Sequence, residues 1–251
     1  MTIQAPENTI GGKKSGAGNV ISGNDGYGVF VSGFSDGDEN RIEGNFVGTT
    51  ADGRGDLGNT GDGVSVQNRA ELTAIGGTLP GAPNRIAYNG GDGVSVRVDD
   101  TLGTNILSNR IYNNDDLGID LDSDGVTVND TGDPDTGPNN LQNFPTIIMA
   151  RKSNSTGRTT ITGRLNSNPT QDFVIQCFLT DGASGYGEGS LLLDDFAPTS
   201  TNADGRASFS CESPRSLLGV QAGQTVSATA TNVATGDTSE FSRNKSIVAV
   251  P

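Results

Sequence analysis

The sequence contains no histidine and no tryptophan, and only two cysteines and two methionines. Without histidine, a Ser-His-Asp or Cys-His catalytic arrangement is impossible, and a His-bound zinc site is excluded. Lysine and arginine are also scarce, 16 against 30 acidic residues, so the formal net charge is −14. Nucleic acids and anionic membranes are bound through clusters of Lys and Arg. Neither is therefore an expected partner, and cations are the natural counterpart of such a chain.

Long hydrophobic runs are also lacking. No stretch approaches 18 consecutive apolar residues, so no membrane insertion is expected. The N-terminus, MTIQAPENTIGG, has neither the charged region nor the apolar region of a signal peptide. A cytoplasmic protein would look the same here. Because a repeat begins almost at once, we expect a piece of a longer extracellular or cell-surface protein whose signal peptide lies outside this sequence.

Only 32% of the residues are hydrophobic, and 37 of 251 are glycine. This composition would suit disorder, except that the apolar residues recur at regular positions, as they do in repeat proteins. The phrase GDGVSV occurs at 61–66 and again at 91–96, and a shift of 65 places superposes Ile10 on Ile75. A shorter unit repeats inside each copy. Four units result, and their first phrase contains Ile10, Ile42, Ile75 and Ile106.

Each unit offers three strands of three or four residues, too short to be stable alone but able to pair with the same strand of the next unit. Such pairing stacks equivalent residues about 4.8 Å apart. The repeat therefore predicts a parallel β-helix of about four coils. The two copies of GDGVSV should lie on one another, with their valines inward and with Ser65 and Ser95 facing solvent.

Two further columns support this interpretation. An asparagine precedes the second strand of every unit, and a glycine precedes the third strand: Asn19, Asn45, Asn84 and Asn109, and Gly28, Gly63, Gly93 and Gly118. Stacked asparagines can hydrogen-bond amide to amide, and asparagine tolerates the left-handed backbone of a sharp corner. The glycines fit corners with positive φ. Both columns are interpreted as structural, the first as an asparagine ladder.

The phrases xIGG, NxIS and GVxV, with NFVGTTADGRGDLGN and LGIDLDSDGVTVNDTGDPDTGPNNLQNFP, resemble the right-handed parallel β-helix repeat regions of large bacterial surface and secreted proteins. The resemblance covers residues 8–146. The pectate-lyase-like superfamily to which it points includes polysaccharide-acting enzymes, phage tailspikes and adhesin-like proteins. It therefore implies the fold and its right-handedness more than an activity.

The pattern divides the chain into a parallel β-helix at 1–121, an Asp/Gly/Pro-rich cap or linker at 122–146, and a β-sandwich at 147–251. Five runs of high β-propensity predict the sandwich: TTITGRL, DFVIQCFLT, SLLLDDF, RASFSCES and QTVSATATNV. We expect an antiparallel Ig-like or fibronectin-like module. The ending TATNVATGDTSEFS resembles the last strands of sandwich modules that follow such β-helices. The module should cap the open C-terminal end of the solenoid.

The two cysteines, Cys177 and Cys211, fall in two of these strands. A disulfide would suit an extracellular protein, whereas two reduced thiols would act as small buried hydrophobic residues. The sequence leaves both alternatives open.

The stretch DLDSDG suggests a calcium loop. Asp120, Asp122 and Asp124 alternate before Gly125, as in the opening of a D-x-D-x-D-G loop, and Ca²⁺ takes six to eight oxygen ligands. Further ligands would come from Asp130, Asp133 and Asp135. The twelfth position is Thr131, where such a loop would carry a bidentate glutamate, and the alternative is that these residues only form Asx turns.

A second candidate site is the outward face of the third strands. Phe30, Ser65, Ser95 and Asp120 should form one row, with Tyr27, Asp62, Asp92 and Leu117 beside it before the glycine corners. Tyr27 and Phe30 could stack on sugar rings. Asp62 and Asp92 lie one coil apart, so the charge of one could raise the pKa of the other, or a cation could bridge the two carboxylates. The alternative is that these aspartates are simply solvated in turns.

We therefore expect an extracellular structural or binding module that contacts polysaccharide or a cell-surface glycan, with Ca²⁺ as the candidate cofactor. Two alternatives remain open, a polysaccharide lyase or glycoside hydrolase, and a passive stalk. No catalytic residue is assigned, since Arg97 and Arg110 qualify only by proximity. The N-terminal coil leaves open a further partner, either a second copy of the chain or upstream coils.

Overall fold

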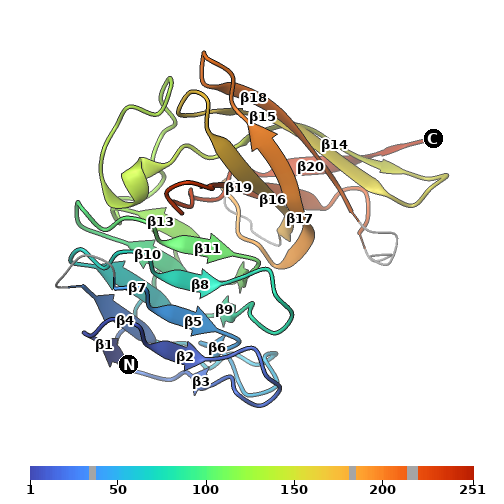
Figure 1. Cartoon of the computed structure of the whole chain (residues 1–251). Coiled ribbons are helices and arrows are strands. Elements are labelled where there is room, and N and C mark those ends of the chain that lie inside the picture. Colours follow the sequence, from blue (N-terminus) through green and yellow to red (C-terminus); the bar gives the residue numbers. More distant parts are fainter. Residues whose placement is uncertain (34–37, 181–184, 214–219) are drawn as a thin grey trace.

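The computed structural model describes residues 1–33, 38–180, 185–213 and 220–251 and is nearly all β. The N-terminal part is drawn from blue to green in Figure 1 and forms three parallel sheets. Each coil adds one strand to a sheet, so the strands stack coil upon coil along one axis. Sheet A contains β1 (Thr2–Ile3), β4 (Val29–Ser32), β7 (Val64–Gln67), β10 (Val94–Val96) and β13 (Ile119–Leu121). Sheet B contains β2 (Thr9–Gly11), β5 (Arg41–Glu43), β8 (Ala74–Gly76) and β11 (Asn105–Leu107). Sheet C contains β3 (Val20–Ile21), β6 (Phe46–Val47), β9 (Arg85–Ala87) and β12 (Arg110–Tyr112).

The register of sheet B confirms the predicted isoleucine column. Ile10 pairs with Ile42, Ile42 with Ile75, and Ile75 with Ile106, and all four side chains are buried. In sheet A the valines of GDGVSV stack on each other as predicted. Strand β1 pairs with β4 and was not predicted, because a strand of two residues has no detectable period. The β-helix architecture thus follows from inward-facing apolar side chains that recur at the same positions of each coil.

The predicted asparagine ladder is present. The side-chain amides of Asn19, Asn45 and Asn84 each donate to Oδ1 of the next member, at 3.0, 3.0 and 2.9 Å, and the ladder ends at Asn109. None of the four has a positive φ, so the left-handed corner expected for them is wrong. At Gly44 and Ser108 the positive φ belongs to the residue before the asparagine.

A second ladder precedes sheet A and was not predicted. Its members are Asn24, Asn59, Asn89 and Asn114, each four residues before the corner glycine, and their amides donate in the same direction at 2.6 to 2.9 Å. The corner glycines themselves do not have positive φ. They are required by close packing instead, since a Cβ added to Gly63 would lie 2.5 Å from Ile86 Cγ2 and 2.7 Å from the Gly93 carbonyl oxygen.

The C-terminal part forms one seven-stranded sheet with the order β17-β16-β19-β20-β14-β15-β18. Its strands are β14 (Thr146–Ser153), β15 (Thr159–Asn166), β16 (Asp172–Thr180), β17 (Leu191–Ser200), β18 (Arg206–Glu212), β19 (Thr225–Asn232) and β20 (Lys245–Val250). The sheet folds over a single apolar core that joins Ile161 of β15 to Ile175 of β16 and Val226 of β19. The β-sandwich is confirmed, although the pair β14–β20 is parallel and the sheet is therefore mixed.

Of the two alternatives for the cysteines, the structure has the disulfide. Cys177 on β16 is bonded to Cys211 on β18, and both residues are fully buried. The bond joins two strands that are not neighbours in the sheet order, so it ties the two halves of the sandwich together.

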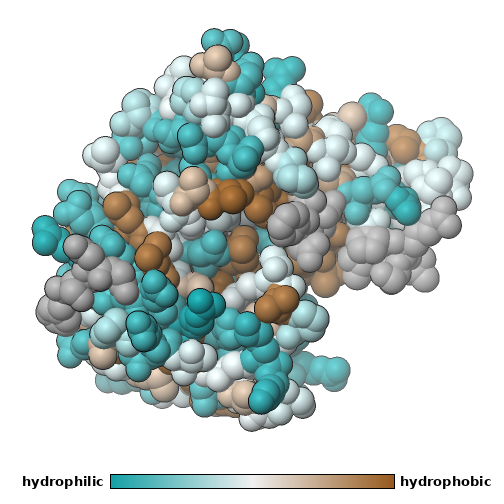
Figure 2. All heavy atoms as spheres, in the orientation of Figure 1, coloured by the Kyte–Doolittle hydropathy of each residue, from teal (hydrophilic) through white to brown (hydrophobic). Residues whose placement is uncertain are grey.

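The sandwich caps the last coil of the β-helix. Backbone N–H groups that would pair with a further coil donate to the sandwich instead: Ile106 to Thr238 Oγ1 (2.9 Å), Ser108 to Gln176 Oε1 (2.9 Å) and Leu121 to Glu240 Oε1 (3.1 Å). Phe178 and Phe241 complete the apolar core of the β-helix. Figure 2 shows hydrophobic residues gathered near the junction of the two domains, within an otherwise mostly hydrophilic face.

Residues of the linker take part in this cap. β13 ends at Leu121 and β14 begins at Thr146, and between them lies the short 3-10 helix η1 (Pro138–Leu141). Asn139 accepts from the N–H of Thr104 and donates to the carbonyl of Thr104, both at 2.8 Å. No helix in the described part of the chain has the length and apolar character needed to cross a membrane.

Candidate functional site

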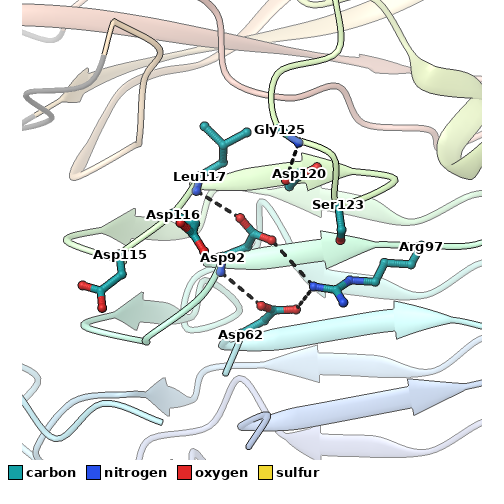
Figure 3. Close-up of a pocket in the computed structure, with 9 residues that line it drawn as sticks. All are labelled: Asp62, Asp92, Arg97, Asp115, Asp116, Leu117, Asp120, Ser123 and Gly125. Carbon is teal, nitrogen blue, oxygen red and sulfur yellow. Dashed lines mark hydrogen bonds and ion pairs between the residues drawn. The ribbon is translucent and has the colours of Figure 1, made fainter. Parts of the chain in front are cut away.

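A polar cavity of about 520 Å³ opens on the outer face of sheet A, beside its last three strands (Figure 3). Six charged residues line it: Asp62, Asp92, Arg97, Asp115, Asp116 and Asp120. We call this cavity the acidic pocket. Leu117 adds an apolar side chain to its wall. Five acidic residues and one arginine thus line a cavity of the size that holds small ligands.

The repeat itself positions Asp62 and Asp92. Each lies immediately before the corner glycine of its coil, and each accepts a hydrogen bond from the next coil. Asp62 Oδ1 accepts from the N–H of Asp92 at 3.1 Å, and Asp92 Oδ1 accepts from the N–H of Leu117 at 3.0 Å. Both side chains are buried, with 4% of each residue exposed. The alternative that these aspartates are solvated is therefore wrong, because the backbone of the next coil and Arg97 cover them.

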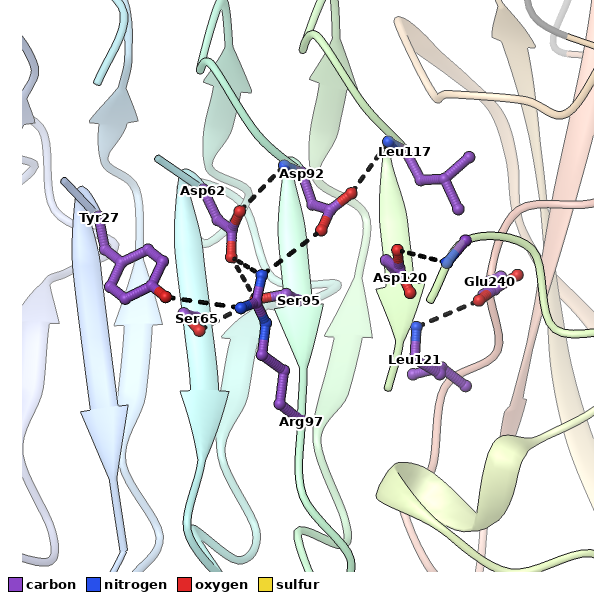
Figure 4. Close-up of polar contacts among 11 residues, drawn as sticks. Tyr27, Asp62, Ser65, Asp92, Ser95, Arg97, Leu117, Asp120, Leu121 and Glu240 are labelled. Carbon is purple, nitrogen blue, oxygen red and sulfur yellow. Dashed lines mark hydrogen bonds and ion pairs between the residues drawn. The ribbon is translucent and has the colours of Figure 1, made fainter. Parts of the chain in front are cut away.

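Arg97 is the central residue of the network and was not assigned from the sequence. Its Nη2 lies 2.7 Å from Asp62 Oδ2 and 3.9 Å from Asp92 Oδ2 (Figure 4). Its Nη1 is 3.5 Å from the hydroxyl of Tyr27, and the guanidinium lies over the Tyr27 ring. The signal was in the sequence, because Arg97 follows Ser95 by two residues and so shares its face of the strand.

Ser65 and Ser95 do not face solvent as the alternation predicts. Both are fully buried, and Ser95 Oγ donates to Asp62 Oδ2 at 2.6 Å and lies 3.0 Å from Ser65 Oγ. They do point to the outer face of sheet A, in register with Phe30 and Asp120. The side chains of Asp62 and Arg97 lie over that face and exclude water from it.

Burial sets the protonation of the pocket. It raises the pKa of the Asp92 carboxyl to about 7, and repulsion by Asp120 and Asp62 adds to the effect. Burial likewise raises the pKa of Asp120 to about 6. Behind Asp120, burial raises the pKa of Glu240 to about 8. Several carboxyl groups therefore titrate near neutral pH, which is common at functional sites.

Asp120 carries an unsatisfied acceptor. The residue is 5% exposed, and its Oδ2 accepts from the N–H of Gly125 at 3.3 Å. Its Oδ1 is buried and makes no hydrogen bond, although the backbone of Ser123 lies close enough to the carboxyl to lower its pKa. Buried acceptors without partners are uncommon in proteins. Asp120 therefore places a carboxylate oxygen without a protein donor at the wall of the pocket.

The predicted aromatic pair extends the site along sheet A. The rings of Tyr27 and Phe30 stack with centroids 5.7 Å apart and an interplanar angle of 16°. Both side chains are half-buried, and Arg97 joins Tyr27 to the acidic pocket. The structure thus brings the four predicted ligand residues Tyr27, Phe30, Asp62 and Asp92 onto one face. Arg110 lies elsewhere, where its Nε donates to the carbonyl of Ser190 at 2.6 Å.

The six aspartates proposed for calcium fall in different places. Asp120 faces the acidic pocket, and Asp122 and Asp124 are exposed in the turn after β13. Among the described residues, only Asp130, Asp133 and Asp135 bring three candidate ligand oxygens within 4.8 Å of one another. Oxygen donors suit Ca²⁺, and Asp135 Oδ1 is buried without a hydrogen-bond partner.

Asp133 already has a structural role in that cluster. Its oxygens accept hydrogen bonds from Gln142 (2.7 Å), the N–H of Asn143 (3.0 Å) and the hydroxyl of Ser167. The linker is thereby fixed to the sandwich whether or not an ion is bound.

No protein-family model matches the chain.

Proposed function

We propose that the protein is an extracellular binding module that contacts polysaccharide through the outer face of sheet A. The observation that carries the proposal is the acidic pocket, with the buried carboxylate of Asp120 lacking a partner on Oδ1. Sugar hydroxyls are donors for carboxylates, and the stacked Tyr27–Phe30 pair on the same face offers an aromatic surface for a sugar ring. The size of the cavity suits one or two sugar units.

The setting of the site supports this proposal. Disulfides persist in oxidising compartments, so the Cys177–Cys211 bond favours an extracellular or cell-surface location. The stacked coils provide a rigid platform, and rigid platforms lose little entropy on binding an extended chain. The resemblance to pectate-lyase-like β-helices followed by Ig-like modules agrees with a role in carbohydrate contact.

A glycan array followed by calorimetry on the bound glycans tests the proposal. We expect saturable binding that Arg97→Met and Asp120→Asn each weaken by about tenfold or more, a loss of about 1.4 kcal/mol. Asp204→Asn is the matched control, because Asp204 is exposed on the sandwich. Binding that survives both pocket variants would move the site elsewhere. If no glycan binds, the remaining alternative is a passive stalk, in which the repeat only provides length.

Glycoside hydrolysis is a second candidate, favoured by the raised pKa values in the pocket. A carboxyl with a pKa near 7, such as Asp92, is suited to donate a proton to a leaving group, and a second carboxylate such as Asp120 could act as base. A reducing-end assay, with a parallel assay for unsaturated lyase products, separates this candidate from simple binding. Turnover lost in Asp92→Asn with binding retained would establish the hydrolase.

A further inference from the structure

The charge of the acidic pocket restricts the class of sugar it can hold. Five carboxylates line the pocket, and Arg97 is its only cation among the described residues. The guanidinium is already engaged, with Nη2 at 2.7 Å from Asp62 and 3.9 Å from Asp92. Its positive charge is therefore already offset by these two carboxylates, although its buried Nε has no hydrogen-bond partner. An anionic sugar would meet repulsion from the remaining carboxylates.

Asp120 shows where a donor belongs. Its Oδ1 is buried and unpartnered in a residue that is 5% exposed, and the residue lines the pocket (Figure 3). A hydroxyl or an ammonium could donate to this oxygen. The charged donor gives the shorter and stronger hydrogen bond, and it also offsets the repulsion between Asp120 and Asp92.

A bare metal ion fits this pocket less well than an organic cation. Calcium needs six to eight oxygens that converge on one point. Among the described residues the pocket carboxylates do not bring three ligand atoms within 4.8 Å of one another, whereas the linker cluster at Asp130, Asp133 and Asp135 does. The pocket has the volume for a ring that spreads its donors over several carboxylates.

We propose that the acidic pocket binds an amino sugar with a free ammonium group. The ammonium donates to Asp120 Oδ1 and lies near Asp92, while Asp115 and Asp116 at the exposed edge of the pocket attract the cationic chain. The adjoining units extend toward Tyr27 and Phe30. This inference rests on the proposed function and names the class of glycan.

Calorimetry near pH 7, where Asp120, with a pKa of about 6, is largely ionised and the sugar amine is still partly protonated, tests the inference with four probes. They are a β-1,4-linked glucosamine tetramer, its fully N-acetylated form, a galacturonate tetramer and tetralysine. We expect the glucosamine tetramer to bind about tenfold or more tightly than the N-acetylated form, with galacturonate showing no binding. Asp120→Asn should remove this preference, and Asp116→Asn, at an exposed position that does not endanger folding, should reduce it. Asp204→Asn should change nothing.

The other outcomes overturn the inference in distinguishable ways. Equal affinity for the free and N-acetylated tetramers, with both weakened by Arg97→Met, would refute recognition of the ammonium group and leave the proposed polysaccharide site intact. Tighter binding of galacturonate would also refute it. Tetralysine binding as tightly as the glucosamine tetramer would show a general cation surface instead of a sugar site. No binding of any saccharide would remove this inference together with the proposed function.

Discussion

Arg97 Nη2 lies 2.7 Å from Asp62 Oδ2, and this ion pair joins neighbouring coils through residues 35 positions apart. It crosses the row of buried serines on the outer face of sheet A and provides Asp62 and Asp92 with their counterion (Figure 4). A buried charge that loses its partner is costly, so the pair makes the face of the site sensitive to single substitutions.

Arg97→Met should therefore destabilise the fold at neutral pH. The substitution keeps an apolar stem but leaves Asp62 and Asp92 without a cation, and we expect the free energy of unfolding to fall by about 2–4 kcal/mol. Urea denaturation measures the loss. Arg69→Met is the matched control, because its ion pair with Asp100 is exposed and should contribute less than about 0.5 kcal/mol. Equal losses of unfolding free energy in the two variants would show that the buried Arg97 network contributes no more to stability than an exposed ion pair.

The raised pKa of Asp92 predicts a stability that falls as pH rises. Its carboxyl has a pKa of about 7 in the folded protein, where Asp62, Asp116, Asp120 and Arg97 surround it, against an ordinary value of 3.8. The folded state therefore holds a proton that the unfolded state has released between about pH 4 and about pH 7. The stabilisation from this group is complete below that window and is lost across it, on the order of 2–4 kcal/mol.

Asp92→Asn should remove this dependence. The amide oxygen can still accept from Leu117, and no charge develops as pH rises, so the variant should gain stability relative to the wild type toward pH 8. Denaturation midpoints across the pH range measure the slope. Asp99→Asn removes the same charge from an exposed position and should keep the wild-type slope. Parallel curves for Asp92→Asn and the wild type would contradict the prediction.

Period and spacing predicted the architecture well because a β-helix repeats its packing at every coil. Ile42 and Ile75 are in the same column because they meet the same environment. The site depends on residues that depart from the repeat, and such residues in one coil cannot be predicted from the sequence of another coil. Arg97 stands at a position that holds arginine in only one coil, and Gln67 holds the equivalent position of the coil before. Its side chain covers the outer face of sheet A, and Ser65 and Ser95 are buried beneath the arginine. Glu240 reaches the last coil from a separate domain, so no pattern within the repeat could indicate it.

The calcium hypothesis stays a prediction, and the structure narrows it to Asp130, Asp133 and Asp135. If the cluster binds Ca²⁺, the ion should raise the free energy of unfolding over that in chelator by about 2.7 kcal/mol at a hundredfold excess over Kd. Asp135→Asn should abolish the response, because Asp135 Oδ1 is the unpartnered oxygen of the cluster. Asp124→Asn should retain it, since Asp124 is exposed outside the cluster. Identical curves with calcium and chelator would refute the hypothesis.

The junction of the two domains predicts a specific cost for losing one cap. Thr238 Oγ1 accepts from the N–H of Ile106 at 2.9 Å and lies 2.9 Å from the hydroxyl of Thr231. Thr238→Val keeps the shape but leaves that buried N–H unpaired, so the free energy of unfolding should fall by about 1–3 kcal/mol. The Ile106 amide should also exchange with solvent faster, because its N–H loses the acceptor that Thr238 provides. The matched control is Thr162→Val, a half-buried position on β15, and it should change stability by less than about 0.5 kcal/mol. Unchanged exchange at Ile106 would mean that the coil is held closed without this hydrogen bond, and the sandwich would then cap the solenoid through its apolar contacts at Phe178 and Phe241.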